Sequence, residues 1–172
     1  TVQHNSISPI ILLLIQATML SISPAEQNVA LYGRPTQSSV LELGQAINAV
    51  DGNTESDFNR GSCSSTRLQN SPWWRVDLLA EHNISPLRIT NRDDDCCRGW
   101  LAGAQVLVGN HQDHNWNQWC GEISSGGQVA REFCCLGMMG RYVSVTHHNV
   151  NRILSLCEVE VFRVPVRDEN CP

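Results

Sequence analysis

The side chains best suited to bind a ligand lie in a turn-like stretch from Gln45 to Cys63, whose centre reads Asn48-Ala-Val-Asp51-Gly-Asn53. Short oxygen-bearing side chains surround a glycine there, and glycine can take a positive φ, so carbonyls and a carboxylate can turn toward one centre. A hard cation such as Ca²⁺ needs such oxygen ligands. The stretch is not an EF-hand, because no glutamate holds the twelfth loop position and no helical pattern flanks it. The simpler interpretation is an Asx-rich turn that hydrogen-bonds its own backbone.

A second segment, far along the chain, favours the cation. Cys157 could form a disulfide with Cys63 at the end of the turn, and Glu158 follows Cys157 directly. Such a disulfide would bring the Glu158 carboxylate beside the Asn/Asp turn and complete a cage of oxygen atoms. We therefore expect a calcium site made by two distant segments.

The other unusual stretch places three aspartates and two adjacent cysteines directly after Arg92. Adjacent Cα atoms lie only about 3.8 Å apart, below the usual span of a disulfide. Cys96 and Cys97 therefore either pair with separate partners or form a vicinal disulfide, which would present an apolar sulfur surface beside Arg92. The aspartates from Asp93 to Asp95 are most simply a solvated loop.

The sequence gives little evidence of a set of catalytic residues. The six histidines have no partnered nucleophile, and His147 and His148, beside a strand end, are expected to be solvated. His111 and His114 lack the helix that metal chelation at this spacing favours. We expect a protein that is not an enzyme.

Charge and composition narrow the partners further. The net charge is −5, and all 12 basic residues are arginines without a basic cluster, so nucleic acid is not an expected partner. Residues 7–20 are apolar but too short to span a bilayer, and Ser23-Pro24-Ala25 follows with small residues at a cleavage site. This pattern predicts a secretory signal peptide over residues 1–25 whose start is incomplete, and no membrane span after it.

Cysteine usage also indicates export. All eight cysteines follow residue 25, and an even number of cysteines suits the oxidising, extracellular environment of a secreted protein. A zinc site is the alternative, but no Cys-x-x-Cys spacing occurs among them.

The elements that must position these residues are strands. Trp74, Val76 and Leu78 share one face of the alternating segment 72–78, as expected for a half-buried strand. Residues 84–90, 104–109, 141–146 and 156–162 repeat the pattern, whereas residues 46–70 lack periodicity and predict a long functional loop. At least five short strands without a helical stripe predict one all-β domain over residues 26–172, a β-sandwich with a short C-terminal tail.

Six motifs occur in the order found in the F-type lectins, or fucolectins. They are Asn-Ala-Val-Asp-Gly-Asn, Gly-Ser-Cys, Pro-Trp-Trp-Arg-Val-Asp-Leu, Asn-Arg-x-Asp-Cys-Cys (here with one inserted aspartate), Gly-Arg-Tyr-Val and Leu-Cys-Glu-Val-Glu-Val. The chain resembles this family over about residues 27–163. The resemblance implies a jelly-roll β-sandwich of the galactose-binding-domain-like type with a structural Ca²⁺. It also implies a secreted, often oligomeric protein of innate immunity that binds terminal fucose on glycans.

The resemblance carries the calcium site over intact, with several ligands contributed by backbone carbonyls. The matching residues are Asn48, Asp51, Asn53, Ser62, Cys157 and Glu158. It also implies the disulfides Cys63–Cys157, Cys96–Cys97 and Cys120–Cys134, which leaves Cys135 for Cys171.

The sugar site carries over only in part. Arg92 is retained, but Ser65 stands at the family's histidine position and Trp100 at its second arginine. Phe58 remains where the family packs an aromatic ring near the sugar's methyl group, and Cys96 and Cys97 would form an apolar floor. An extra aspartate between Arg92 and Cys96 lengthens the loop by one residue.

Losing two of three polar anchors predicts weakened or altered fucose recognition, because each charge-assisted hydrogen bond contributes about 1.5–3 kcal/mol. Trp100 could instead stack on a sugar ring, or it could simply pack within the loop. Arg60, Arg67 and Arg98 could act as substitute donors.

These observations predict a secreted, calcium-containing lectin for fucosylated or other glycans. A single such site is expected to bind at about millimolar strength, so a homo-oligomer would supply the avidity. The alternative is a discoidin-like extracellular module that binds protein or lipid and no sugar.

Overall fold

The computed structural model describes residues 27–124 and 129–163, so the predicted signal peptide and C-terminal tail lie outside the described residues. The strands are β1 (Gln27–Asn28), β2 (Arg34–Gln37), β3 (Ser64–Ser65), β4 (Gln69–Asn70), β5 (Trp73–Thr90), β6 (Gln105–Gly109), β7 (Gln118–Glu122), β8 (Ala130–Phe133), β9 (Met138–Thr146), β10 (Asn151–Arg152), β11 (Ser155–Leu156) and β12 (Glu158–Arg163). Five short 3₁₀ helices connect them, namely η1 (Val29–Tyr32), η2 (Ala46–Ala49), η3 (Phe58–Arg60), η4 (Arg98–Leu101) and η5 (His114–Trp116). Within this part of the chain, no helix has the length and apolar character needed to cross a membrane.

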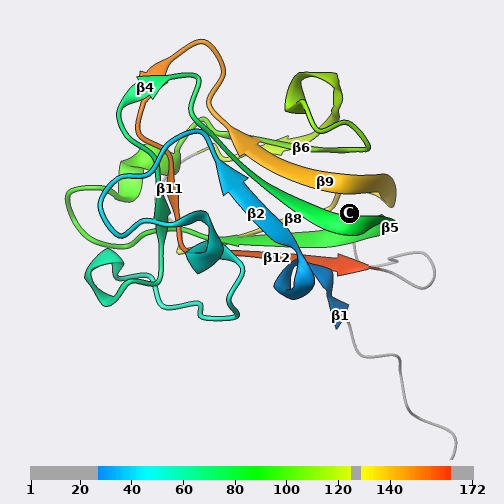
Figure 1. The fold of residues 1–172 in the computed structure, drawn as a ribbon, viewed down its shortest axis with the longest axis horizontal. Coiled ribbons are helices and arrows are strands. Elements are labelled where there is room, and N and C mark those ends of the chain that lie inside the picture. The colour runs from blue at the N-terminus through cyan, green and yellow to red at the C-terminus, as the bar shows by residue number, and fades with distance from the viewer. Residues whose placement is uncertain (1–26, 125–128, 164–172) are drawn as a thin grey trace, which may run out of the picture.

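Strand β5 connects the two layers of the sandwich (Figure 1). Its first half pairs with β2 on one side and β9 on the other. Strand β9 pairs in turn with β6, and β6 pairs with β7. The second half of β5 pairs with β12 and β8, and β12 also pairs with β1. The change of layer falls near Leu79, which has a φ of 68°, where the register with β9 shifts between Asp77 and His82. The result is an all-β jelly roll.

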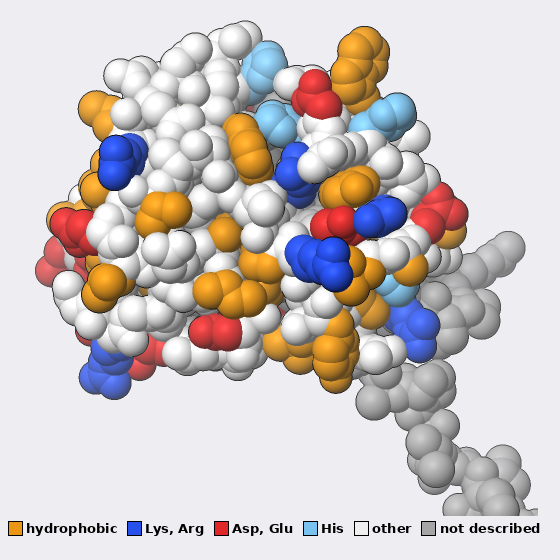
Figure 2. Space-filling model, viewed as in Figure 1, with side chains coloured by type: hydrophobic (Ala, Val, Ile, Leu, Met, Phe, Trp, Pro, Cys, Tyr) orange, Lys and Arg blue, Asp and Glu red, His pale blue; other side chains and the backbone are white. Residues whose placement is uncertain are grey.

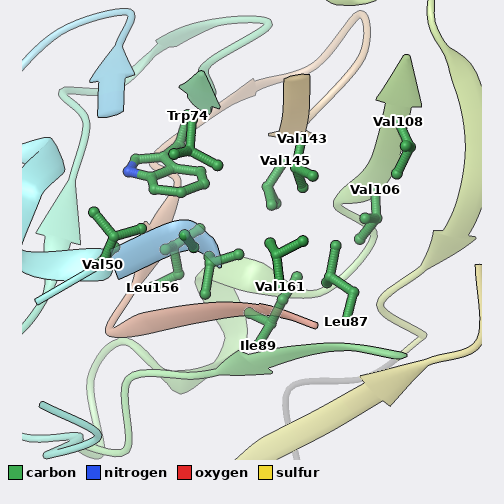
Figure 3. Close-up of a cluster of buried hydrophobic side chains, with 14 of the residues drawn as sticks. Val50, Trp74, Leu87, Ile89, Val106, Val108, Val143, Val145, Leu156 and Val161 are labelled. Carbon is green, nitrogen blue, oxygen red and sulfur yellow. The ribbon is translucent and has the colours of Figure 1, made fainter. Parts of the chain in front are cut away.

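The core between the layers comes from strict alternation along the strands. Trp74, Val76 and Leu78 of β5 are buried, as their shared face predicts. Figure 3 shows Trp74 among valines of β6 and β9 and the aliphatic side chains of the opposite layer. Burial of each such side chain stabilises the fold by about 1.5–3 kcal/mol. The Trp74 indole N–H donates to the carbonyl of Ala46 at 3.1 Å, so the one polar atom of this ring is satisfied.

The predicted strands are present as strands, but their bounds differ from those predicted. The segments expected at 72–78 and 84–90 form one bent strand, because β9 stays paired to β5 on both sides of the bend. Strands β7 and β8 were not predicted, because neither segment alternates regularly between apolar and polar residues in the sequence. The predicted loop 46–70 contains η2, η3 and two-residue strands that pair with β10 and β11.

Two of the four expected disulfides are confirmed and two are wrong. Cys63–Cys157 and Cys96–Cys97 are present, but Cys120 bonds to Cys135 rather than to Cys134. The adjacent cysteines differ in exposure, and Cys135 is the one buried in the core, against which Cys120 packs. Because Cys135 is used in this way, the expected Cys135–Cys171 bond is also wrong. Cys134 is disulfide-bonded as well.

The surface carries both signs of charge in an interspersed arrangement. On the face shown in Figure 2, arginine and acidic side chains lie between apolar and uncharged polar ones. Several of these charges pair across strands, as Arg88 does with Glu132 and Glu160 at 3.2 and 3.4 Å.

Candidate functional site

Two loops from distant parts of the chain meet at one end of the sandwich, where β4 and β11 also lie (Figure 1). The backbone N–H of Asp93 donates to the carbonyl of Ser56 at 3.0 Å. The guanidinium carbon of Arg92 lies 4.1 Å from the ring centroid of Phe58 and 5.2 Å from that of Trp100. Arg92 is thus stacked against two aromatic rings, in contacts that each contribute about 0.5–2 kcal/mol. The structure therefore brings Phe58, Arg92 and Trp100 together.

Local sequence explains how Phe58 is held. Asp57 caps η3 by accepting from the backbone N–H of Asn59 at 2.9 Å. Gly61 ends the helix with a φ of 73°, a conformation that glycine adopts without steric cost. Phe58 is buried in a cluster with Cys63 and Cys157, so the disulfide supports the ring on which Arg92 stacks.

His147 holds the backbone at Trp100, and the prediction that this histidine is solvated was wrong. His147 is buried rather than solvated, and its Nε2–H donates to the carbonyl of Trp100 at 2.8 Å. Burial lowers the pKa of His147, against the opposing effect of this hydrogen bond, so the environment disfavours the protonated imidazole. Beside Trp100 lies a cavity of about 370 Å³, which is also lined by Leu68, Gly99, Asn151, Arg152 and Ile153.

The Asp93–Asp95 segment is not the solvated loop that the sequence suggested. Arg92 donates from Nε to Oδ1 of Asp94 and from Nη2 to Oδ2, the latter at 2.6 Å. This hydrogen bonding lowers the pKa of Asp94, against the opposing effect of burial. Asp93 pairs with Arg98 at 2.6 Å, and only Asp95 of the three is exposed. The extra aspartate in this loop was the available signal, but its partner could not be read from the sequence.

The vicinal disulfide borders this ion pair. Sγ of Cys96 lies 3.2 Å from Oδ2 of Asp94 and 3.9 Å from Nη2 of Arg92. Cys96 is exposed and Cys97 is buried, so Cys96 lies at the surface beside Arg92. Asp94, Cys96 and Cys97 have the proximity of metal ligands, but both sulfurs are in the disulfide and neither is the thiolate that metals bind.

The other polar positions are either buried or paired within the protein. The side chain of Ser65 is fully buried, and its hydroxyl has no hydrogen-bond partner. Arg60 pairs with Glu55 and Asp57, and Arg67 donates to the carbonyl of Val40. These cations therefore already have protein partners, as Arg98 does.

The second group of candidate residues surrounds Glu158. Its Oε1 accepts from the backbone N–H of Gly52 at 3.1 Å, which places the carboxylate at the turn as the sequence predicts. Its Oε2 is buried and has no hydrogen-bond partner. Burial, together with the nearby charge of Asp51, raises the pKa of Glu158 to about 8, against the opposing effect of the hydrogen bond from Gly52. A buried carboxylate oxygen without a partner, next to a second carboxylate, fits a site for a divalent cation.

The other five expected calcium ligands carry side-chain or backbone oxygen atoms. Most of these residues already make a hydrogen bond or a disulfide within the protein. Asn48 donates to the carbonyls of Leu43 and Cys63 at 3.0 and 3.1 Å, which leaves its own oxygen available. Oδ1 of Asp51 accepts from the N–H of Asn53 at 2.9 Å. Ser62 is buried and donates to the carbonyl of Asp57. Cys157 is bonded to Cys63, so the disulfide joins both halves of the set.

Comparison with known proteins agrees with this architecture. The fold and site define a galactose-binding-like domain, and the family model of the NedA-like, galactose-binding domain matches residues 48–145. Fucolectin-4 of Anguilla japonica is 45% identical over 145 residues, which cover 79% of each chain. This chain belongs to the F-type lectins, the fucolectin family.

Solved structures give the same result. A fucolectin from the serum of the striped bass, Morone saxatilis, matches with a TM-score of 0.75 and 38% identity, covering 83% of this chain and 49% of that one. This chain thus spans about half of the bass protein. The lectin domain of Lectinolysin complexed with Lewis B antigen matches with a TM-score of 0.73 and 33% identity, covering 80% and 97%. These relatives are lectins rather than enzymes.

Proposed function

We propose that this chain is a secreted carbohydrate-binding lectin that holds one calcium ion and recognises glycans at the Phe58–Arg92–Trp100 surface. The observation that carries the proposal is the convergence of these three side chains with the vicinal disulfide, in a chain of the fucolectin family. Such a surface offers ring faces and a sulfur atom for the C–H groups of a sugar.

Calcium is proposed from the chemistry of the Glu158 region. Asp51 and Glu158 would supply carboxylate oxygens, and Asn48, Asn53, Ser62 and Cys157 would supply side-chain or backbone oxygens. The ion would neutralise two neighbouring carboxylates and give the buried Oε2 of Glu158 its missing partner. Its role would be structural, because it would tie the turn to the strand that carries Glu158 and so support the nearby Phe58.

Fucosylated glycans are the first ligand class to test. The relatives are named as fucolectins, and one solved relative is complexed with Lewis B antigen. Fucose recognition is expected to be weak here, because Ser65 is buried and Arg92 is bonded to Asp94. A weak single site favours a homo-oligomer, in which linked sites raise the overall affinity. Secretion agrees with the disulfides of the domain.

A glycan array probed with the mature chain tests the proposal. Binding that free sugar displaces would support a lectin. The same array, repeated with an oligomeric fusion, guards against missing a site of about millimolar affinity. No signal at any glycan density in either format would refute the lectin and leave a discoidin-like module that binds protein or lipid.

A further inference from the structure

One acceptor sequence for N-linked glycosylation occurs in the chain, Asn83-Ile84-Ser85. An asparagine followed two positions later by serine or threonine is the acceptor in a secreted protein, provided that the residue between them is not proline. The motif lies in β5, and neither the glycan surface nor the proposed calcium site uses it.

The fold leaves Asn83 exposed while it buries the rest of the motif. Ile84 belongs to the core and Ser85 is 1% exposed, whereas Asn83 lies at the surface. In the part of the chain that the structure describes, the side-chain amide of Asn83 makes no hydrogen bond. The exposed amides of Asn59 and Asn115, in contrast, donate to neighbouring aspartates. A glycan on Asn83 would therefore break no hydrogen bond of the described fold.

Burial of Ser85 requires that the motif be modified before the domain folds. The strands that pair with this part of β5 are β9, where Asn83 is opposite Met139, and β12, where Ile84 is opposite Arg163. Both strands are synthesised after the motif. The nascent chain therefore presents Asn83 and Ser85 together, and only Asn83 has to stay at the surface once these strands have paired.

Exposed apolar side chains lie beside Asn83. Because Met139 is directly opposite it in the register of β5 with β9, the two side chains share a face of the sheet. Asn83 also lies against the turn before β9, where a Cβ atom on Gly137 would come within 2.9 Å of its Oδ1. Leu136 of this turn is 77% exposed and Met139 is 51% exposed. Such apolar surface suits the C–H face of a sugar attached at Asn83.

This part of β5 is remote from the surface proposed to bind glycans. The bend of β5 lies at the end of the sandwich opposite β4 and β11 (Figure 1). Asn83 shares β5 with Thr90, which precedes the loop of Arg92, and the strand between them spans about 23 Å at about 3.3 Å per residue. A glycan on Asn83 would therefore leave the Phe58–Arg92–Trp100 surface open.

We propose that Asn83 carries an N-linked glycan whose first sugar covers Met139 and Leu136. Nδ2 of Asn83 forms a bond to the anomeric carbon of N-acetylglucosamine, which a lipid-pyrophosphate oligosaccharide donates. The bond from that carbon to the pyrophosphate oxygen breaks, the pyrophosphate leaves with the electron pair, and the amide proton passes to a base of the transferase. The inference rests on the proposed secretion, because the donor and the transferase belong to the secretory pathway.

Occupancy of the site should be partial. Pro86 follows the motif directly, and the residue before a proline is restricted to extended conformations. Fewer nascent chains can then turn the Ser85 hydroxyl toward the transferase beside Asn83. We expect two forms of the secreted protein, one with the glycan and one without it.

The test expresses the chain in animal cells behind a secretion signal supplied by the vector and digests the product with peptide-N-glycosidase. The larger form should shift to the mass of the smaller one, and mass spectrometry should find an aspartate where the asparagine of the motif stood. Asn83→Gln should lack the larger form. Asn70→Gln is the matched control, because it changes another exposed asparagine on a strand but lies outside such a motif, and it should retain the shift.

Two results would refute the glycan. Wild-type protein that shows no shift would do so, and a shift that persists in Asn83→Gln would place the glycan on another residue. Either result leaves the lectin function standing, because the glycan array tests that function with the unglycosylated, refolded chain.

Oxidation of Met139 tests whether the sugar covers the apolar side chains. Hydrogen peroxide converts an exposed methionine to its sulfoxide, which peptide mass spectrometry detects. Met139 should be oxidised several-fold more slowly in the separated glycosylated form than in Asn83→Gln, and digestion with the glycosidase should restore the faster rate. Equal rates in the two proteins would refute the cover.

Discussion

The Glu158 region and the Arg92 region share one disulfide but differ in how their polar groups are satisfied. Cys63–Cys157 lies directly before Glu158 and underneath Phe58, on which Arg92 stacks. At Glu158 a buried carboxylate oxygen lacks a partner, whereas Arg92 is bonded to Asp94 within its own loop. Buried polar groups in folded proteins nearly always have partners. The first region therefore fits the proposed calcium ion, whereas the polar groups of the second are paired with one another.

The largest expected effect comes from removing the element that both regions share. The double variant Cys63→Ser with Cys157→Ser removes a bond between residues 94 positions apart. In the chain-entropy model, this should lower the free energy of unfolding by about 4–5 kcal/mol, measured by urea denaturation. Cys96→Ser with Cys97→Ser is the control, because a bond between adjacent residues closes almost no loop. Equal losses in the two double variants would show that the disulfides do not act through chain entropy.

Removal of calcium should have the next largest effect and should act on one region only. A ligand present at 100 times its dissociation constant stabilises the native state by about 2.7 kcal/mol. We expect EDTA to lower the melting temperature of the wild type, and Glu158→Gln to abolish the response to added calcium. Glu122→Gln removes one carboxylate from an exposed position on β7 and should respond as the wild type does. An unchanged wild-type melting curve in EDTA would contradict the calcium proposal.

A smaller effect on glycan affinity should distinguish the contribution of Trp100 from that of Arg92. Aromatic packing of the kind that Trp100 offers contributes about 0.5–1.5 kcal/mol, so Trp100→Ala should weaken glycan binding by about two- to tenfold. Arg92→Ala should weaken it less, because the Arg92 side chain is only 8% exposed and already donates to Asp94. Surface plasmon resonance on the best array ligand measures both. A larger loss in Arg92→Ala than in Trp100→Ala would show that the arginine still contacts the sugar.

The smallest expected effect is a pH dependence of stability from His147. Burial lowers the pKa of His147 in the folded state, so its contribution is fully present above the unfolded pKa of about 6.5. That contribution is lost as the pH falls from there through the folded pKa, because the unfolded chain then binds a proton more readily. His114, whose pKa is also lowered by burial, acts in the same direction. Glu158, whose pKa is raised, acts in the opposite direction but is common to the wild type and the variant. Melting temperatures measured from pH 7.5 to 5 should therefore fall more, or rise less, in the wild type than in His147→Gln. An identical slope in the variant would exclude His147 as its source.

The sequence was sufficient to predict features that follow a regular repeat, such as the buried faces of strands. It was insufficient to predict contacts that depend on the geometry of loops. Alternation at Trp74, Val76 and Leu78 predicted the buried face of β5, because strand side chains have a fixed period of two. The Cys120 partner was missed, because a shift of one residue along the chain reverses the direction of a side chain and Cys134 adjoins Cys135. Contact of Asp94 with Arg92 depends on the turn around Asp94 and on the rings that hold Arg92, and neither has a local pattern.

The place of β12 between β1 and the second half of β5 bears on how the protein is made. Both neighbours are synthesised well before residues 158–163, at about 5–20 residues per second, so this layer lacks its middle strand until the domain is almost complete. Pairing of strands far apart in sequence is also slow. The nascent chain should therefore expose the unpaired edge of β5 until β12 emerges, and it is during this interval that chaperones would bind it.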